Sequence, residues 1–408
     1  MNQPAVQRCD VAIVGGGMIG ASLALALAAS PLQVVLIEAV AASSAAQPSF
    51  DDRTTALGNG SRCVLQTLGV WEQIALRSAP ICHIHVSDAG HFGFSRLHAS
   101  EHQLPAFGYT VANRHMGTVL WQALTLHGRI ELASPARVSE VSVAAGCVRL
   151  TVQQAGAQRL LQARLVVAAD GANSLVKQAA GIASSASDYA QVALVANIST
   201  AQRAAGIAYE RFTRTGPLAL LPLYDGSYTL VWTLPPQRSP AMQECSDGEF
   251  CGALQRSFGW RAGQILQVGA RSSYPLSLVR AEAVSAERVV LVGNAAQALH
   301  PVAAQGFNLG LRDAATLAEL IAAAADPGAP ALLAQFEQRR AADRRGMIAF
   351  TDRLVKLFAD QRGAAVAARD LGLLLFDLSP PAKRALSRLS WGFGDSLPRL
   401  ARGLPLSW

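Results

Sequence analysis

Three glycines near the start of the chain, Gly15, Gly17 and Gly20, have the spacing of a nucleotide-binding turn, and Glu38 follows them. In such a turn the first glycine allows a tight bend, the second lets the backbone approach a pyrophosphate, and the third lets a helix pack closely on its strand. A carboxylate at the position of Glu38 can accept hydrogen bonds from ribose hydroxyls. The pattern predicts a dinucleotide site and does not choose between NAD and FAD.

A second group of residues that could bind such a ligand lies in the segment 289–315. A buried strand there ends at Asn294, a loop holds His300 and Pro301, and Gly306 precedes a helix. Asn294 can hydrogen-bond a sugar-like hydroxyl. The positive end of the helix suits a reduced flavin, which carries negative charge around N1 and O2. An NAD-dependent dehydrogenase needs no second helix end of this kind, so the segment favours FAD.

The elements that must position these residues follow from the hydrophobic pattern. We expect a strand at 10–14, a helix at 18–29 and a strand at 33–37, which together form a βαβ unit. A β-meander is expected from 138 to 169. Its last strand ends at Asp170, where an acid and backbone amides would lie near the pyrophosphate.

The order of the elements predicts an α/β fold: a Rossmann-like (GR2-type) FAD-binding domain with an inserted antiparallel-sheet substrate domain and a C-terminal helical segment. The discontinuous FAD-binding domain is expected at 1–75, 105–180 and 275–330, the substrate-binding β-sheet domain at 76–104 and 181–274, and the C-terminal helical region at 331–408. Within this scheme we expect a helix over 56–68 and a two-residue hairpin turn at Asp225-Gly226.

Composition disfavours several other classes. The net charge of +7 is spread along the chain without aromatic residues between the basic ones, which disfavours nucleic-acid binding. The six cysteines lack metal-binding spacing and are typical of a reduced cytoplasmic protein. The histidines between His83 and His102 do not combine with other ligands into a metal-binding pattern, so no metal is expected. The apolar stretch after Arg8 is interrupted by the glycine turn, unlike a signal peptide, and no other segment is long enough to span a membrane.

Four segments resemble one protein family. They are FDDRTTALGNGS, HVSDAGHFGF, ERFTRTGPLALLPLYDGSYTLVW and GNAAQALHPVAAQGFNLGLRD. Together with the glycine turn they are similar to the flavoprotein aromatic monooxygenases of the para-hydroxybenzoate hydroxylase type, and within these to the ubiquinone-biosynthesis branch that hydroxylates 2-polyprenyl-6-methoxyphenol. Asn294 and Gln297 stand where the wider family has Asp and often His, and both departures are similar to those of that branch.

The resemblance implies which residues hold the cofactor. The ADP half of FAD would be bound by Gly15, Gly17, Gly20 and Glu38. Arg53 would approach the pyrophosphate and the ring, and Arg114 the cofactor phosphates, with a surface charge as the alternative for both. Asp170 would lie near the pyrophosphate and the approach of the pyridine nucleotide, and Asn294 would contact the ribityl chain or the pyrophosphate. The isoalloxazine would be lined by Pro301, Gly306 and Asn308. The expected catalytic positions are His300 and Pro301, in the loop beside the ring.

The resemblance also implies the reaction. With FAD as cofactor, NAD(P)H as cosubstrate and O2, the chain would convert a lipophilic polyprenyl phenol, 2-polyprenyl-6-methoxyphenol, to the 1,4-benzoquinol in ubiquinone biosynthesis. A group that accepts the phenol proton is expected, with Tyr224, Tyr228 and His300 as candidates. Three alternatives stay open: hydroxylation of another ring position or another aromatic substrate, an NAD-dependent dehydrogenase, and a non-catalytic subunit of a quinone-synthesis complex.

A lipophilic substrate also bears on where the protein works. We expect a cytoplasmic protein, with peripheral contact to the inner membrane as an open alternative. Other ubiquinone-biosynthesis proteins and a second copy of the chain, in a homo-oligomer, are the candidate protein partners. The basic and aromatic residues after Pro381 could lie on an anionic membrane or form a helix pair that caps the flavin domain.

Overall fold

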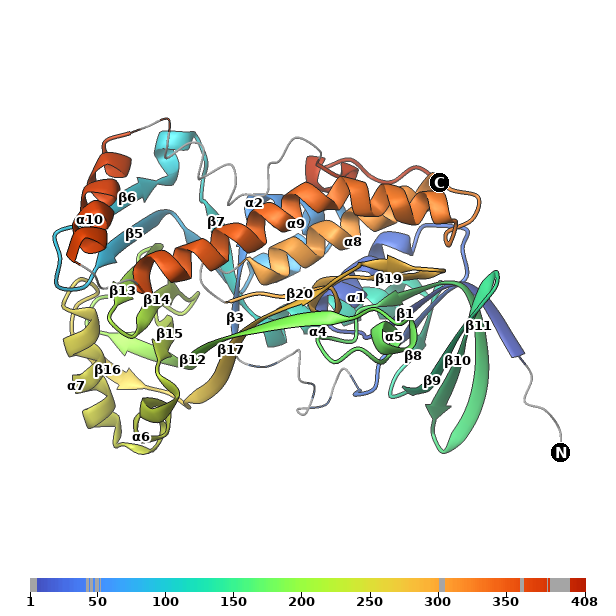
Figure 1. Cartoon of the computed structure of the whole chain (residues 1–408), viewed down its shortest axis with the longest axis horizontal. Helices are drawn as coiled ribbons and strands as arrows, with labels where there is room; N and C mark the ends of the chain where they lie inside the picture. Colours follow the sequence, from blue (N-terminus) through green and yellow to red (C-terminus); the bar gives the residue numbers. More distant parts are fainter. Residues whose placement is uncertain are drawn as a thin grey trace.

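Two large sheets form the body of the molecule, and the long helix α9 (Pro330–Ala359) runs along both of them (Figure 1). The computed structural model describes residues 6–41, 44, 47, 51, 53–300, 305–359, 363–379, 381 and 397–408. Among the helices of this described part, none is long and apolar enough to cross a membrane.

The first sheet has a parallel centre with the strand order β19-β11-β1-β2-β8. These strands are β1 (Val6–Val14), β2 (Val34–Ile37), β8 (Ile130–Ala133), β11 (Ala157–Ala168) and β19 (Val289–Leu291). β2 lies on one side of β1 and β11 on the other, so the carboxyl end of β1 is a switch point at which open α/β sheets bind ligands. The centres of β1 and β11 are fully buried, which explains their continuous apolar runs.

Smaller elements complete this unit. The meander strands β9 (Arg137–Ala144) and β10 (Cys147–Gln154) extend from β11, and β18 (Ser285–Ala286) borders β19. Helices α1 (Met18–Leu27), α4 (Asn113–His127), α5 (Leu175–Ala179) and α8 (Gly306–Ala322) accompany the sheet. A three-stranded sheet, β3 (Thr54–Gly58), β7 (Gly108–Ala112) and β4 (Ser78–Ile81), lies beside α2 (Asn59–Thr67) and α3 (Trp71–Ala75).

The second sheet has nine strands in the order β20-β17-β12-β15-β14-β13-β5-β6, with β16 on β12. They are β5 (His83–Asp88), β6 (Phe94–His98), β12 (Ser184–Thr200), β13 (Ile207–Thr213), β14 (Gly216–Pro222), β15 (Tyr228–Leu234), β16 (Ile265–Val268), β17 (Ser272–Ala281) and β20 (Gln297–Ala298). One face packs on α7 (Asp247–Phe258), and Leu220, Leu230 and Trp232 are buried there. Because strand side chains alternate, Ala219, Leu221 and Val231 lie on the other face, and they are only partly buried.

The C-terminal region is helical where it is described. α10 (Gly363–Asp377) packs on β6, and the short turn η5 (Arg399–Arg402) packs on α2 and α8. Thr67 donates to the carbonyl of Leu400 at 3.1 Å, and the backbone N–H of Arg399 donates to Glu319. The end of the chain therefore caps the first unit, while most of the basic stretch after Pro381 lies outside the described residues.

The α/β class with an inserted antiparallel sheet is confirmed, and three local expectations need correction or refinement. The helix expected over 56–68 begins only at Asn59, because the preceding residues form β3 and pair with β7. The hairpin at Asp225-Gly226 has three residues in its loop, since Leu223 N–H donates to the carbonyl of Ser227 at 2.8 Å. The boundary expected at residue 275 falls within β17, which stays paired with β12 up to Ala281.

Candidate functional site

The parallel strands bring four of the expected residues to one edge of the first sheet. Glu38 follows β2, Gly15 follows β1, Asp170 follows β11 and Asn294 follows β19. Neighbouring strands lie about 4.8 Å apart, so the row from β2 to β19 spans roughly 14 Å. An extended dinucleotide fits along such an edge, where the carboxyl ends of the strands meet.

The glycine turn is built around Gly15 and Gly20. Gly15 has φ +103°, a conformation that favours glycine, and a Cβ there would lie 2.4 Å from the carbonyl oxygen of Ala169. A Cβ on Gly20 would lie 1.9 Å from the carbonyl oxygen of Gly15. Both glycines are therefore required by the protein itself, because β1, β11 and α1 approach one another too closely for a side chain.

Glu38 fixes the turn from the side of β2. Its carboxylate is buried and accepts hydrogen bonds from the N–H of Gly16 at 2.6 Å and of Val40 at 2.9 Å. The two oxygens have lone pairs left over for ribose hydroxyls. Trp121 of α4, which the sequence analysis missed, donates its indole N–H to the Gly16 carbonyl at 2.8 Å. No local pattern links Trp121 to a turn a hundred residues earlier.

Asp170 has an incomplete set of hydrogen bonds. One carboxylate oxygen accepts from the N–H of Leu175 at 3.0 Å, while Oδ1 is buried and has no hydrogen-bond partner among the described residues. Burial raises the pKa of Asp170. A buried acceptor of this kind is completed by a ligand hydroxyl or by an ordered water.

Asn294 and the start of α8 lie close together beyond β19. Asn294 is exposed in the turn η3 (Gly293–Ala295), and α8 packs so tightly on this turn that a Cβ on Gly310 would be 3.0 Å from the Cα of Gly293. α8 begins at Gly306 with no side-chain cap and no acidic residue in its first turn. Its first N–H groups and its positive dipole are thus available to an anion.

Asn308 makes structural hydrogen bonds within the protein, and its contact with the isoalloxazine stays a prediction. Its oxygen accepts from the N–H of Gly58 at 2.8 Å and from the hydroxyl of Ser61 at 2.7 Å, and its amide donates to the carbonyl of Ala56 at 2.9 Å. The side chain ties α8 to β3 and α2, so it positions the start of α8.

The two arginines converge on the segment at residue 51. The Arg53 side chain pairs with Asp51 and lies 4.8 Å above the ring of Tyr274 in β17. Arg114 is exposed at the start of α4, and its N–H donates to the Asp51 carbonyl at 2.9 Å. Trp121 lies two turns further along this helix, roughly 10 Å away, and contacts the glycine turn. Their contact with a cofactor stays a prediction.

His300 is buried, and its ring lies edge-on to Tyr189 with 5.2 Å between the centroids. Burial lowers the pKa of His300 to about 4, so the imidazole is neutral at pH 7. Pro301 lies outside the described residues. Among the residues that are described, no three His, Cys, Asp or Glu side chains are grouped so as to hold a metal ion.

Gln297 belongs to a buried polar network at the base of this loop. Its amide donates to Asp313 of α8 at 3.0 Å, and its oxygen accepts from Nε and Nη2 of Arg344, at 2.8 and 2.6 Å. Arg340 pairs with Asp313 at 2.6 Å and with Asp343. The departure from histidine therefore has a structural reason: an amide donates to the acid and accepts from the arginine at once.

These residues fit FAD on the geometry described. A glycine cradle, a buried carboxylate and two uncapped helix N-termini line one edge of the sheet, with an unsatisfied oxygen of Asp170 between them. The helix ends suit the pyrophosphate and the anionic ring.

The position of Asn294 leads to a prediction about the cofactor's potential. We expect Asn294→Asp to keep FAD but to lower its midpoint potential by about 10 to 40 mV, because one partly screened negative charge disfavours the anionic reduced ring. Gln158→Glu adds the same charge at the far, exposed end of β11 and should leave the potential unchanged. A redox titration of both variants decides this, and an unchanged or higher potential in Asn294→Asp contradicts it.

Comparison with known proteins gives a consistent picture. A family described as "FAD binding domain" matches residues 8–351. The chain is 38% identical to "Ubiquinone hydroxylase UbiL" of Rhodospirillum rubrum, over 97% of this chain and 93% of that one. It is 32% identical to the "3-demethoxyubiquinol 3-hydroxylase" of Escherichia coli, over 96% of this chain and 99% of that one.

The fold is shared with solved structures at lower identity. The p-nitrophenol 4-monooxygenase PnpA of Pseudomonas putida superimposes with a TM-score of 0.79 and 19% identity, over 96% of this chain and all of that chain. At this identity the likeness concerns the fold alone.

Proposed function

Because the chain belongs to the FAD binding domain family of flavin-dependent monooxygenases, we propose that it hydroxylates the ring of a lipophilic polyprenyl phenol in ubiquinone biosynthesis. The substrate we propose is 2-polyprenyl-6-methoxyphenol, and the product is the 1,4-benzoquinol. The observation that carries the proposal is the row of Glu38, the glycine turn, Asp170 and Asn294 along one sheet edge, beside the start of α8. A second ring position is the main alternative, since one relative is named for hydroxylation at position 3.

The chain's own residues bind and orient in this mechanism. When bound, FAD takes electrons from NAD(P)H and activates O2 for transfer of one oxygen atom. The N–H groups at the start of α1 hold the pyrophosphate and Glu38 holds the ribose. The N–H groups at the start of α8 stabilise negative charge on the ring. The second sheet offers the partly buried apolar face to the phenol, where water is excluded from the reacting atoms.

The test is direct. The purified protein should be yellow, its flavin spectrum should bleach under NAD(P)H without O2, and with O2 a short-chain 2-prenyl-6-methoxyphenol should gain one oxygen atom. Mass spectrometry and NMR of the product give the ring position. A colourless protein that binds no added FAD would favour the non-catalytic subunit instead.

A peripheral membrane location is part of the proposal, and the outer edge of the second sheet supports it. Leu371 and Leu375 of α10 and Leu378 just after it are exposed at helical spacing, and Phe92 is 67% exposed in the neighbouring loop. The N–H of Gly93 donates to Asp370 at 3.2 Å and so joins this loop to α10. We call Phe92, Leu371, Leu375 and Leu378 the apolar edge.

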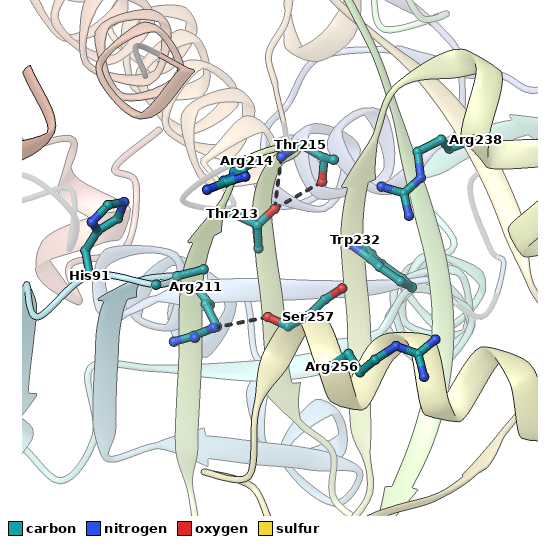
Figure 2. Close-up of a pocket in the computed structure, with 11 residues that line it drawn as sticks. His91, Arg211, Thr213, Arg214, Thr215, Trp232, Arg238, Arg256 and Ser257 are labelled. Atoms are coloured by element: carbon teal, nitrogen blue, oxygen red, sulfur yellow. Dashed lines mark hydrogen bonds between the residues drawn. The ribbon is translucent and has the colours of Figure 1, made fainter. Parts of the chain in front are cut away.

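A basic pocket adjoins the apolar edge, and Figure 2 shows its side chains. The pocket has a volume of about 400 Å³ and lies on the α7 side of the sheet. It is lined by His91, Arg211, Arg214, Arg238 and Arg256, with hydroxyls from Thr213, Thr215 and Ser257, and by no acidic residue. Leucines beside uncompensated arginines are what an anionic lipid surface attracts.

Membrane binding should therefore depend on both parts of this surface. We expect the protein to sediment with phosphatidylglycerol-containing vesicles and much less with pure phosphatidylcholine. Arg214→Gln with Arg256→Gln should weaken binding roughly 30-fold, at about 1 kcal/mol per arginine. Arg137→Gln with Arg149→Gln, two exposed arginines of the distant meander, is the matched control. Equal loss in both double variants, or no loss in either, argues against the location.

A further inference from the structure

We infer that Glu210 of β13 is the catalytic residue that takes the proton of the phenol hydroxyl. The inference rests on the proposed function and names a group within its site. Three observations support it: Glu210 lies in an apolar row of the second sheet, the nearby charged groups are paired with one another, and its Oε1 has no hydrogen-bond partner among the described residues.

Strand register places Glu210 in one row with four apolar residues. Val86 of β5 and Ala219 of β14 are its direct neighbours, and Val231 of β15 and Val195 of β12 continue the row. All five are partly buried, whereas the residues between them face α7 and form a closed core. The row is an apolar surface with one carboxyl group in it, which matches a lipophilic ring that carries one hydroxyl.

This face of the sheet contacts the segments of Arg53 and His300, both expected to lie near the cofactor. Thr229, two residues before Val231, hydrogen-bonds with its hydroxyl to Thr54 at 2.7 Å, and Thr54 directly follows Arg53. Phe212, two residues after Glu210, packs with Val355 of α9 and with Tyr189, whose ring contacts His300. Residues on the same face as Glu210 are thus connected to the Arg53 segment through Thr229 and to His300 through Phe212 and Tyr189.

The carboxyl group of Glu210 has no partner in the described part of the chain. Its Oε1 is buried and makes no hydrogen bond, although the residue keeps some accessible surface. A buried carboxyl oxygen without a donor is costly, and proteins keep such groups at functional sites. Burial alone raises the pKa of Glu210 to about 7, close to the value that suits a base at neutral pH.

The charged groups around Glu210 are paired with one another. Asp88 of β5 lies on the same face and forms a salt bridge with Arg369 of α10 at 2.6 Å. Asp352 of α9 accepts from Tyr189 at 3.3 Å and pairs with Lys356. His300 is uncharged at pH 7. β14 contributes only Pro217, Ala219 and Leu221 to this face, so no neighbouring charge neutralises Glu210.

The proton transfer completes the hydroxylation. As the ring carbon forms its bond to the oxygen atom, the phenol O–H bond breaks, its electron pair becomes a ring C=O bond, and the proton moves to the Glu210 carboxylate. The C–H bond of the ring carbon then breaks, its electron pair returns to the ring, its proton goes to water, and the oxygen of the C=O group takes a proton back from Glu210. The second oxygen atom of O2 leaves as water, with both electrons supplied by NAD(P)H.

The test compares Glu210→Gln with the wild type on a short-chain 2-prenyl-6-methoxyphenol across pH 5.5 to 9. For the wild type, kcat/KM should rise with pH through about 7 as the free carboxyl loses its proton. In Glu210→Gln we expect a loss of about a hundredfold at pH 8 and no such rise. Reduction of the flavin by NAD(P)H in the absence of phenol should be unchanged. Glu140→Gln, an exposed strand carboxyl on β9, should behave as the wild type.

A second readout is independent of turnover. The folded-state pKa of Glu210 is raised, so its contribution to stability is present at low pH and is lost as pH rises through about 7. The melting temperature of Glu210→Gln should therefore increase relative to the wild type between pH 5 and pH 8. If Glu210→Gln keeps the wild-type rate and pH profile, the inference is wrong and the proposed function stands. If the wild type hydroxylates no polyprenyl phenol at any pH, both fail.

Discussion

A Gly17→Val protein should fold and purify without FAD. Gly17 caps α1 with φ −61° and ψ 179°, extended backbone that any residue adopts, so its conformation does not require glycine. A branched cap residue costs about 1 kcal/mol or less. The valine side chain would occupy the space through which the pyrophosphate reaches the backbone. The measurement is flavin absorbance per protein, together with the melting temperature.

Two other glycines separate cofactor loss from misfolding. Gly248→Val, on an open surface of α7, should fold and keep its flavin, since a Cβ there meets nothing within 4 Å. Gly20→Val should fail to fold, because the Cβ would lie 1.9 Å from the Gly15 carbonyl oxygen. A Gly17→Val protein with a full flavin complement would show that the pyrophosphate does not approach this residue.

Removing Asp313 should cause the largest loss of stability outside the glycine turn. Asp313 is fully buried, and its partner Arg340 is 3% exposed. Asp313→Leu leaves the Arg340 charge with Asp343 alone and takes the acceptor from Gln297, so we expect the free energy of unfolding to fall by about 3 to 5 kcal/mol. Urea denaturation of the apo protein measures this.

The double variant Asp313→Leu with Arg340→Met should recover most of that loss, because it removes both charges from the interior. Lys356 forms an exposed pair with Asp352 on α9, the helix that also carries Arg340. Lys356→Met should change the free energy of unfolding by less than about 1 kcal/mol. If Asp313→Leu is as mild as Lys356→Met, the buried network does not hold α8 to α9.

The elements proposed to hold the ADP half were predictable because their signals are local. Strand, glycine turn, helix and Glu38 lie within a few tens of residues, and Gly15 and Gly20 each have a steric reason in that turn. β3 was missed because its pairing partner β7 lies some fifty residues away, and only a paired neighbour makes Thr54–Gly58 a strand. The same distance hides the tie between Gln297 and Arg344.

The phenol side of the site was harder to derive from the sequence. Alternation predicts that β13 and β15 are strands, but it does not tell which of their two faces meets the core. Of the proposed proton acceptors, Tyr228 is 2% exposed on the α7 side and Tyr224 is 56% exposed in the hairpin loop. Neither lies in the row of Glu210, which is identified only when the register of β13 and β14 is known.

The strands of the first sheet come from distant parts of the chain, and this determines when the sheet can be completed during synthesis. The glycine turn leaves the ribosome early, but β19 and α8 are encoded from residue 289 onward in a chain of 408. Until they emerge, Val166–Ala168 at the end of β11 lack their neighbour β19, and the helix end proposed to face the flavin ring is missing. The nascent protein can therefore assemble its complete flavin pocket only after most of the chain has been made, and cofactor capture is a late step of its biogenesis.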